Sequence, residues 1–123
     1  MRIILSIVAA TLAAQPAFAQ AADPAAGQRT FLQCRACHTL KAGEKHLNGP
    51  NLHRMFGSKA ASKPGYAYSP ALAKAGFTWT DAKLDEWLAN PRSFLPGNKM
   101  MFAGVKDPAA RRNLIAYLKL ATK

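Results

Sequence analysis

Cys34-Arg35-Ala36-Cys37-His38 is the stretch on which the rest of the chain depends. It follows the pattern C-x-x-C-H, the attachment signature of a c-type haem. The thiols of Cys34 and Cys37 are spaced to add to the two vinyl groups of one porphyrin. His38 follows directly and is placed to bind the iron. The sequence therefore predicts one covalent haem c with its iron, and leaves open which residue binds the iron on the other face.

The cysteine pair also allows a redox dithiol or a zinc site. A thioredoxin-like C-x-x-C needs a βαβ setting, and the chain has no strand-rich runs. The two histidines of a zinc site would have six residues between them, outside the usual finger spacing. Haem attachment is therefore favoured over a zinc site made of Cys34, Cys37, His46 and His53.

Residues 1–19 have the organisation of a secretory signal peptide. Arg2 provides a positive charge, residues 3–14 are almost wholly apolar, and Ala17-Phe18-Ala19 has the spacing that signal peptidase recognises. The apolar run is shorter than the roughly 20 residues that a membrane-spanning helix needs. We expect cleavage after Ala19, export to the periplasm and a single monohaem domain over residues 20–123, with an uncleaved membrane anchor as the alternative.

The chain is strongly basic. Its 123 residues include 17 lysines and arginines and 6 aspartates and glutamates, a net charge of +11 that becomes +10 when Arg2 is removed. Such a charge suits nucleic acid, an anionic membrane or an acidic protein surface. Because an exported protein rarely meets nucleic acid, we expect an acidic protein partner and no nucleic acid.

Capping residues and apolar spacing predict an all-α chain of short helices and long loops. Three of the expected helices begin at a capping residue followed by proline, and Thr80 caps another. The expected helices run from Pro24 to about Arg35, from Pro70 to about Ala75, from Thr80 to Asn90 and from Pro108 to about Ala121.

The sequence also predicts a close backbone contact on the first helix, the orientation of one arginine and two long loops. Gly27 and Phe31 share one helix face, and the glycine indicates that another backbone passes close to it. Arg111 is expected to face outward from the last helix. Residues 39–65 and 92–106 are expected to be loops, and loops of this length in a small domain suggest that they wrap a cofactor.

The second axial ligand has five candidates, Met55, Met100, Met101, His46 and His53. Methionine is ordinarily core filler, which suits Met55. Met100 and Met101 lie instead in a turn-rich loop, and adjacent side chains cannot both face one pocket. A methionine thioether would raise the reduction potential, but spacing alone does not choose between these two residues.

Several segments together resemble the class I c-type cytochromes, mitochondrial cytochrome c and its bacterial periplasmic counterparts. They span nearly all of the chain after residue 19, in the family's order and spacing. The resemblance implies short helices and long loops around one covalently bound haem, with the N- and C-terminal helices crossing. The segments are C-R-A-C-H-T at 34–39, G-P-N-L-H at 49–53, P-G-Y-A-Y at 64–68, F-T-W at 77–79, N-P at 90–91, P-G-N-K-M-M-F-A-G at 96–104 and L-I-A-Y-L-K at 114–119.

The resemblance also implies roles for single residues. The methionine after the lysine of the family's P-G-x-K-M loop binds the iron, which selects Met100 and leaves Met101 a packing position. Pro50 matches the proline whose carbonyl steadies the axial histidine. Tyr68 and Trp79 match residues that hydrogen-bond a haem propionate.

Two further features follow from the family pattern. His46 matches a structural histidine that ties two loops together. At the crossing of the terminal helices, Gly27 and Phe31 match residues that pack against Leu114 and Tyr117.

Four positions depart from the mitochondrial pattern. Ser58 stands where those proteins have an arginine near a propionate, and Trp87 where they have a tyrosine near the ligand methionine. Leu72 replaces a polar residue near the same pocket, and Asn98 replaces a threonine in the ligand loop. Losing a positive charge at position 58 is expected to lower the reduction potential.

The resemblance implies a soluble, monomeric, periplasmic one-electron carrier of a respiratory or photosynthetic chain, and not an enzyme. The donor would be a quinol-oxidising complex, and the acceptor an oxidase, a reaction centre or a denitrification enzyme. The alternatives are a haem enzyme, peroxidase-like or gas-binding, with Met100 displaced, or a relay subunit fixed to a larger complex. The cations expected to dock on acidic partners are Lys41, Lys45, Lys99, Lys106 and Arg92.

Overall fold

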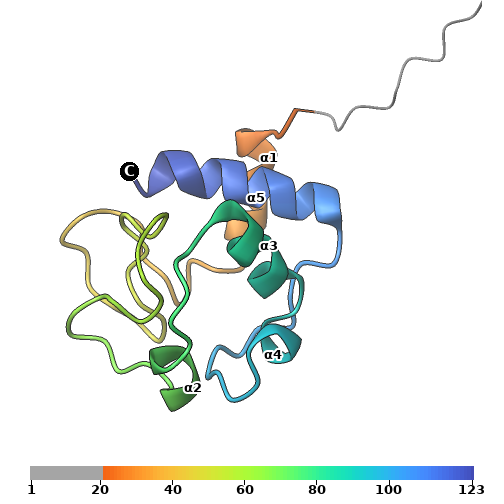
Figure 1. Cartoon of the computed structure of the whole chain (residues 1–123). Coiled ribbons are helices and arrows are strands. Elements are labelled where there is room, and N and C mark those ends of the chain that lie inside the picture. Colours follow the sequence, from red (N-terminus) through yellow and green to blue (C-terminus); the bar gives the residue numbers. More distant parts are fainter. Residues whose placement is uncertain (1–20) are drawn as a thin grey trace, which may run out of the picture.

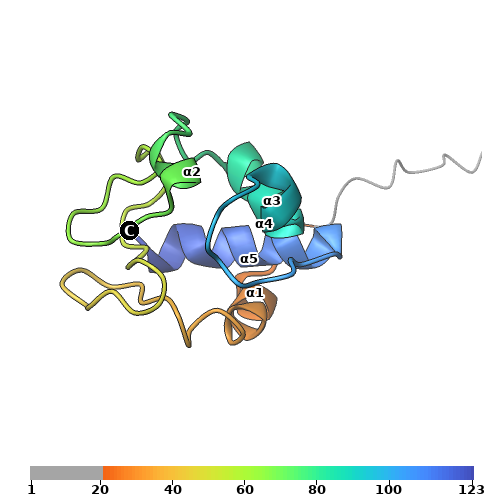
Figure 2. The ribbon, with the colours of Figure 1, turned by 90° about the horizontal axis from the view of Figure 1, so that it is seen from below.

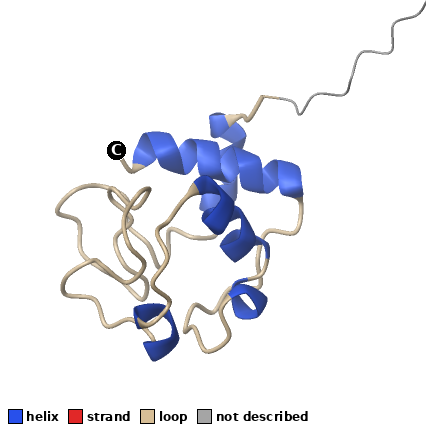
Figure 3. Cartoon of the chain, viewed as in Figure 1, coloured by secondary structure: helices blue, strands red, loops and turns tan. Residues whose placement is uncertain are grey.

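The computed structural model describes residues 21–123, and within that range it contains helices and loops but no strand (Figure 3). An isolated antiparallel bridge joins Lys59 to Thr78. The predicted all-α class is confirmed, and the predicted signal peptide lies outside the described residues. The helices are α1 (Pro24–Phe31), α2 (Pro70–Ala73), α3 (Asp81–Ala89), α4 (Pro91–Phe94) and α5 (Pro108–Ala121).

Each of these helices begins at a side-chain cap that satisfies a free backbone N–H of its first turn. The Asp23 carboxylate accepts from the Ala25 N–H at 3.0 Å, and Asp107 accepts from Ala109 at 3.0 Å. Ser69 and Thr80 cap α2 and α3 in the same way. The predicted helix starts are therefore confirmed.

α1 is shorter than predicted, because it ends at Phe31 and not near Arg35. The chain continues in successive turns: the Cys34 N–H donates to the Phe31 carbonyl at 2.8 Å, and the His38 N–H donates to the Cys34 carbonyl at 3.0 Å. The C-x-x-C-H segment is thus a turn segment that follows α1. α2 is also shorter than predicted and ends at Ala73.

The structure adds a helix that was not predicted, since α4 lies partly within the expected loop 92–106. Asn90 explains this difference. Its extended backbone ends α3, while its side chain accepts from the Ser93 N–H at 3.2 Å and caps α4. The N-P pair at 90–91 therefore starts one helix as well as stopping another.

α1 and α5 cross in direct contact, and both views of the ribbon show one lying against the other (Figures 1 and 2). A Cβ at Gly27 would overlap the Asn113 carbonyl and lie 2.9 Å from the Leu114 nitrogen. Beside this contact, the ring centroids of Phe31 and Tyr117 are 5.7 Å apart. The predicted crossing of the terminal helices, with Gly27 at the closest approach, is confirmed.

The core lies between α1, α3 and α5 and includes loop residues. Met55 is 7% exposed, which confirms its expected role as core filler. None of the described helices is long and apolar enough to cross a membrane. The buried apolar side chains are Phe31, Met55, Leu84, Trp87, Leu88, Val105, Leu114, Ile115 and Leu118.

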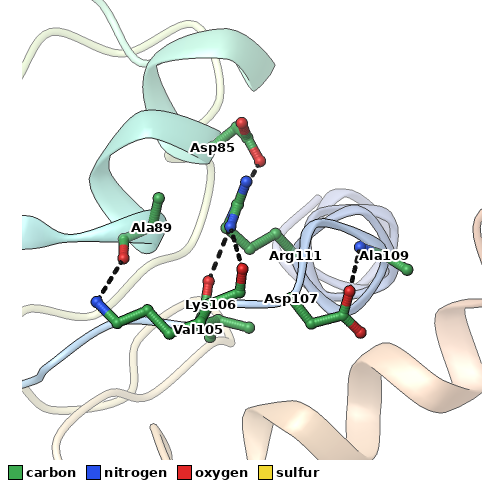
Figure 4. Close-up of polar contacts among 7 residues, drawn as sticks. All are labelled: Asp85, Ala89, Val105, Lys106, Asp107, Ala109 and Arg111. Atoms are coloured by element: carbon green, nitrogen blue, oxygen red, sulfur yellow. Dashed lines mark hydrogen bonds and ion pairs between the residues drawn. The ribbon is translucent and has the colours of Figure 1, made fainter.

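Arg111 does not face outward as predicted, because its side chain is only 12% exposed. Its Nε donates to the Asp85 carboxylate of α3 at 2.8 Å, and its Nη1 donates to the Val105 carbonyl at 3.0 Å and the Lys106 carbonyl at 3.1 Å (Figure 4). Lys106 in turn donates to the Ala89 carbonyl at 3.1 Å. The cluster fastens the chain just before α5 to the end of α3.

Candidate haem-binding site

A cavity of about 480 Å³ lies between the helices and the long loops. Its volume is within the roughly 300–1,000 Å³ typical of cofactor and small-molecule sites. Apolar side chains from distant segments wall it, including Phe31, Leu52, Leu84 and Leu114. The fold thus brings to one cavity all the residues predicted for the site, namely Cys34, Cys37, His38, Pro50, Tyr68, Trp79 and Met100.

Cys34 and Cys37 lie on the wall of this cavity and are not joined by a disulfide. Burial, reinforced by the charge of a Cys37 thiolate, raises the pKa of Cys34 to about 11, so this thiol is protonated at neutral pH. Within the described range, no group of three or more histidine, cysteine or acidic side chains could hold a metal ion. The zinc alternative therefore has no cluster to support it.

His38 is held in one tautomer. Its Nδ1–H donates to the Pro50 carbonyl oxygen at 2.8 Å, and because a carbonyl can only accept, Nδ1 carries the proton and Nε2 keeps its lone pair. Burial lowers the pKa of His38, against the opposing effect of the Pro50 hydrogen bond, so the ring is neutral at pH 7. A neutral imidazole oriented through its second nitrogen is the form that ligates iron.

Gly49 leaves room for the His38 ring because it has no side chain. A Cβ at Gly49 would lie 2.7 Å from Nδ1 and 2.8 Å from Nε2 of His38, closer than side-chain packing permits. The Gly49 N–H also donates to the Cys37 carbonyl at 2.9 Å, which fixes this backbone beside the attachment segment. Sequence analysis placed Gly49 only in an expected loop, although its place before Pro50 could have indicated this role.

Replacing Gly49 with alanine should lower the free energy of unfolding of the haem-loaded protein by about 1–3 kcal/mol, the usual cost of overpacking. The new methyl group must displace the His38 ring and strain its hydrogen bond to Pro50. Chemical denaturation measures the change. Lys45→Ala, at an exposed position of the same loop, should change stability by less than about 0.5 kcal/mol; equal stabilities of the two variants would contradict the close packing.

His46 ties two loops together. Its Nδ1 accepts from the Asn51 N–H at 2.9 Å, and its Nε2 donates to the Pro64 carbonyl at 2.9 Å. Both ring nitrogens are therefore occupied. His46 and His53 are also absent from the lining of the cavity. These contacts fit the structural role predicted for His46 and argue against either histidine as the second axial ligand.

Tyr68 and Trp79 border the cavity with polar groups. The Tyr68 hydroxyl accepts from the Lys63 N–H at 3.1 Å, so its own proton is left to donate elsewhere. Burial raises the pKa of Tyr68 and outweighs the effect of the Lys63 bond, which keeps the phenol protonated. Trp79 packs edge-on against Trp87, with ring centroids 5.5 Å apart. Both residues suit hydrogen bonding to a carboxylate, and their predicted role toward the propionates stays a prediction.

The three candidate methionines border the cavity in different ways. Met101 is 99% exposed, whereas Met55 is 7% exposed and belongs to the core. Met100 is partly buried and packs against the core from the loop. Burial thus favours Met100 over its neighbour as the ligand, in agreement with the family pattern.

The Cytochrome c family model matches residues 24–121. The chain belongs to the cytochrome c family. It is 47% identical over 105 residues to cytochrome c of Chlamydomonas reinhardtii, covering 85% of this chain and 94% of that protein. It is 40% identical over 114 residues to cytochrome c2 of Rhodomicrobium vannielii, covering 93% and 91% respectively.

A solved structure gives the same result. Cytochrome cH from Methylobacterium extorquens is 46% identical and superposes with a TM-score of 0.75, over 80% of this chain and 98% of that one. The predicted cytochrome c fold is therefore confirmed. Cytochromes of this family carry electrons, which agrees with the predicted class of protein.

As a cytochrome c, this chain binds haem c with its iron covalently through Cys34 and Cys37. The residues present fit that group. Two thiols from one turn, a neutral His38 with an available Nε2 and a mainly apolar wall all meet in the same cavity. The positions that depart from the mitochondrial pattern also line this cavity, and they are Ser58, Leu72, Trp87 and Asn98.

Proposed function

We propose that this cytochrome is a soluble periplasmic one-electron carrier in which His38 and Met100 are the two axial ligands. When bound, the haem iron alternates between Fe(II) and Fe(III) and so carries one electron. The observation that supports this proposal is the meeting of both thiols, the oriented imidazole and the Met100 loop in one cavity. If His38 and Met100 both bind the iron, neither face of it would be open to peroxide or gases while Met100 stays bound.

The chain's own residues keep the site the same in both oxidation states. Pro50 holds His38 through a short hydrogen bond, and the turns after α1 fix the two cysteines. Tyr68 and Trp79 would donate to the propionates. A site that does not rearrange on electron transfer has little reorganisation to overcome, which suits a carrier.

The proposed docking surface consists of the cations that flank the two ligand segments. All are exposed, although Lys99 also donates to the Ala67 carbonyl and Lys106 donates to two backbone carbonyls. With a net charge of +10 after cleavage, they would steer the monomer to acidic surfaces. The partners proposed are a quinol-oxidising complex as donor and an oxidase or reaction centre as acceptor. The docking residues are Lys41, Lys45, Lys99, Lys106 and Arg92.

Stopped-flow absorbance tests this function. The bimolecular rate of reduction by a quinol-oxidising complex should fall at least about tenfold as ionic strength rises from about 0.01 M to 0.15 M, because the screening length shrinks from about 30 Å to 8 Å. An uncharged reductant should react at the same rate throughout. A salt-independent rate would contradict steered docking, and peroxide-driven turnover would contradict the carrier function.

Ser58→Arg should raise the reduction potential. Ser58 lines the cavity, and its hydroxyl donates to the Met55 carbonyl, so it brings no charge to the site. An added cation disfavours Fe(III) by about 0.5–1.4 kcal/mol at a partly exposed position, equivalent to roughly 20–60 mV for one electron. Protein voltammetry measures the change. Ser58→Gln adds length without charge and should shift the potential less; an unchanged or lower potential in the arginine variant would refute the expectation.

A further inference from the structure

Asn98 makes three hydrogen bonds around the loop that carries Met100. Its Nδ2 donates to the Pro91 carbonyl and to the Leu95 carbonyl, each at 2.8 Å. Its Oδ1 accepts from the Met100 backbone N–H at 2.9 Å. One side chain therefore joins the backbone of the proposed ligand to the carbonyl at the start of α4 and to the carbonyl just after its end.

Only a carboxamide of this length satisfies all three partners. The two carbonyls require two N–H donors, and the Met100 N–H requires an acceptor. Aspartate keeps the acceptor but has no donor. Threonine, the residue of the mitochondrial pattern, has a single hydroxyl proton. The hydrogen bonds also settle the orientation of the amide, since exchanging its oxygen and nitrogen would place like groups together at every contact.

The element to which Asn98 attaches is itself firmly held. Asn90 caps α4, and Pro91 is fully buried. The Phe94 ring packs edge-on against Phe77 and Trp87, with centroid distances of 5.6 Å and 6.1 Å. α4 thus connects Asn98 to the aromatic part of the core. A loop anchored here has a fixed position relative to the cavity.

Other contacts hold the loop through residues on either side of Met100, and not through Met100 itself. Lys99 donates to the Ala67 carbonyl, and its ammonium lies 4.5 Å from the centroid of the Tyr66 ring. The Arg111 cluster fastens the far end of the loop. The Met100 carbonyl accepts from the Phe102 N–H at 3.0 Å, within the loop itself. Asn98 is the contact that ties the Met100 backbone to a helix.

We propose that Asn98 is a positioning residue that holds Met100 in place as an axial ligand and slows its departure from the iron. The proposal rests on the proposed axial role of Met100. Without Asn98, the Met100 backbone would be held only through its neighbours in the loop. The fraction of time that the thioether spends away from the iron should then rise, while the haem stays attached through the cysteines.

The test is the binding of imidazole to the oxidised, haem-loaded protein. At saturating imidazole, the observed rate equals the rate at which Met100 leaves the iron. Asn98→Ala should raise this limiting rate about tenfold or more, the effect of losing a partly buried side chain that makes three hydrogen bonds. Asn98→Asp should also raise it, because this variant loses both donors to the Pro91 and Leu95 carbonyls while keeping the acceptor for Met100.

Asn113→Ala is the matched control. The Asn113 side chain accepts from the Asp23 N–H at 2.8 Å at the helix crossing, so its loss weakens the fold away from the ligand loop. This variant should bind imidazole at the wild-type rate. Wild-type rates in both Asn98 variants, or equal acceleration in Asn113→Ala, would overturn the role of Asn98. A wild-type protein without the sulfur-to-iron charge-transfer band would instead contradict the axial role of Met100.

Discussion

Replacing Met100 with alanine should abolish the weak sulfur-to-iron charge-transfer band of the oxidised protein and lower its reduction potential by a few tenths of a volt. Axial ligands set haem potentials over about 0.8 V, and a thioether favours Fe(II). Loss of the thioether leaves water or an incoming ligand on that face of the iron. Absorption spectroscopy and protein voltammetry on the variant measure both changes.

Met101→Ala is the control that the chain itself provides. The Met101 side chain is the same in chemistry, adjacent in sequence and 99% exposed. Its removal should leave the band intact and shift the potential by little. If Met101→Ala removed the band and Met100→Ala kept it, the ligand assignment would be reversed. If neither variant changed the band, both methionines would be excluded.

Gly27→Ala should strongly destabilise the folded protein, although it adds a single methyl group. In an ordinary helix this change stabilises by about 1 kcal/mol, but here the new Cβ would overlap the Asn113 carbonyl and lie 2.9 Å from the Leu114 nitrogen. Backbone atoms cannot rotate away, so α1 and α5 must separate. We expect a loss of about 3 kcal/mol or more, and a fall in Tm of about 10–20 °C.

Thermal and denaturant unfolding of the haem-loaded protein measure this loss. Gln28→Ala is the control, because Gln28 is the exposed neighbour on the same helix. It should change the free energy of unfolding by less than about 0.5 kcal/mol. A stabilised Gly27→Ala variant would mean that the helices do not touch at this point.

Local signals in the sequence were enough to place most of the helices. A capping side chain followed by proline acts within one turn, so Asp23, Ser69 and Asp107 could be recognised without knowledge of the fold. Helix ends were harder. α1 stops at Phe31 because the attachment segment folds into turns, and nothing in the residues before it indicates that stop.

Contacts between distant segments could not be predicted from local pattern. Arg111 lies on a helix surface by periodicity, yet Asp85 of α3 and the carbonyls of the preceding loop draw it inward. α4 was missed because Asn90 both ends one helix and caps the next. The hydrogen bonds of Asn98 likewise depend on carbonyls that only the folded chain brings near it.

The candidate site was predicted more fully than the fold around it. The cysteines and His38 follow from a contiguous motif, but Pro50, Tyr68, Trp79 and Met100 followed from resemblance to a family, and their meeting in one cavity is a property of the folded chain. Gly49 was not recognised as part of the site, and Asn98 was noted only as a departure from the mitochondrial pattern in the ligand loop. Gly49 matters because it has no Cβ beside the His38 ring, and Asn98 because its side chain bonds to the Met100 backbone. The type of either residue does not reveal such a contact.

The absorption spectrum of the oxidised wild-type protein at neutral pH shows whether His38 and Met100 both bind the iron. If His38 and Met100 both bind the iron, the spectrum is low-spin and contains the weak sulfur-to-iron charge-transfer band. A high-spin spectrum without that band would contradict ligation by both residues, because the iron would then have an open face and the protein would be equipped for ligand binding or peroxide chemistry.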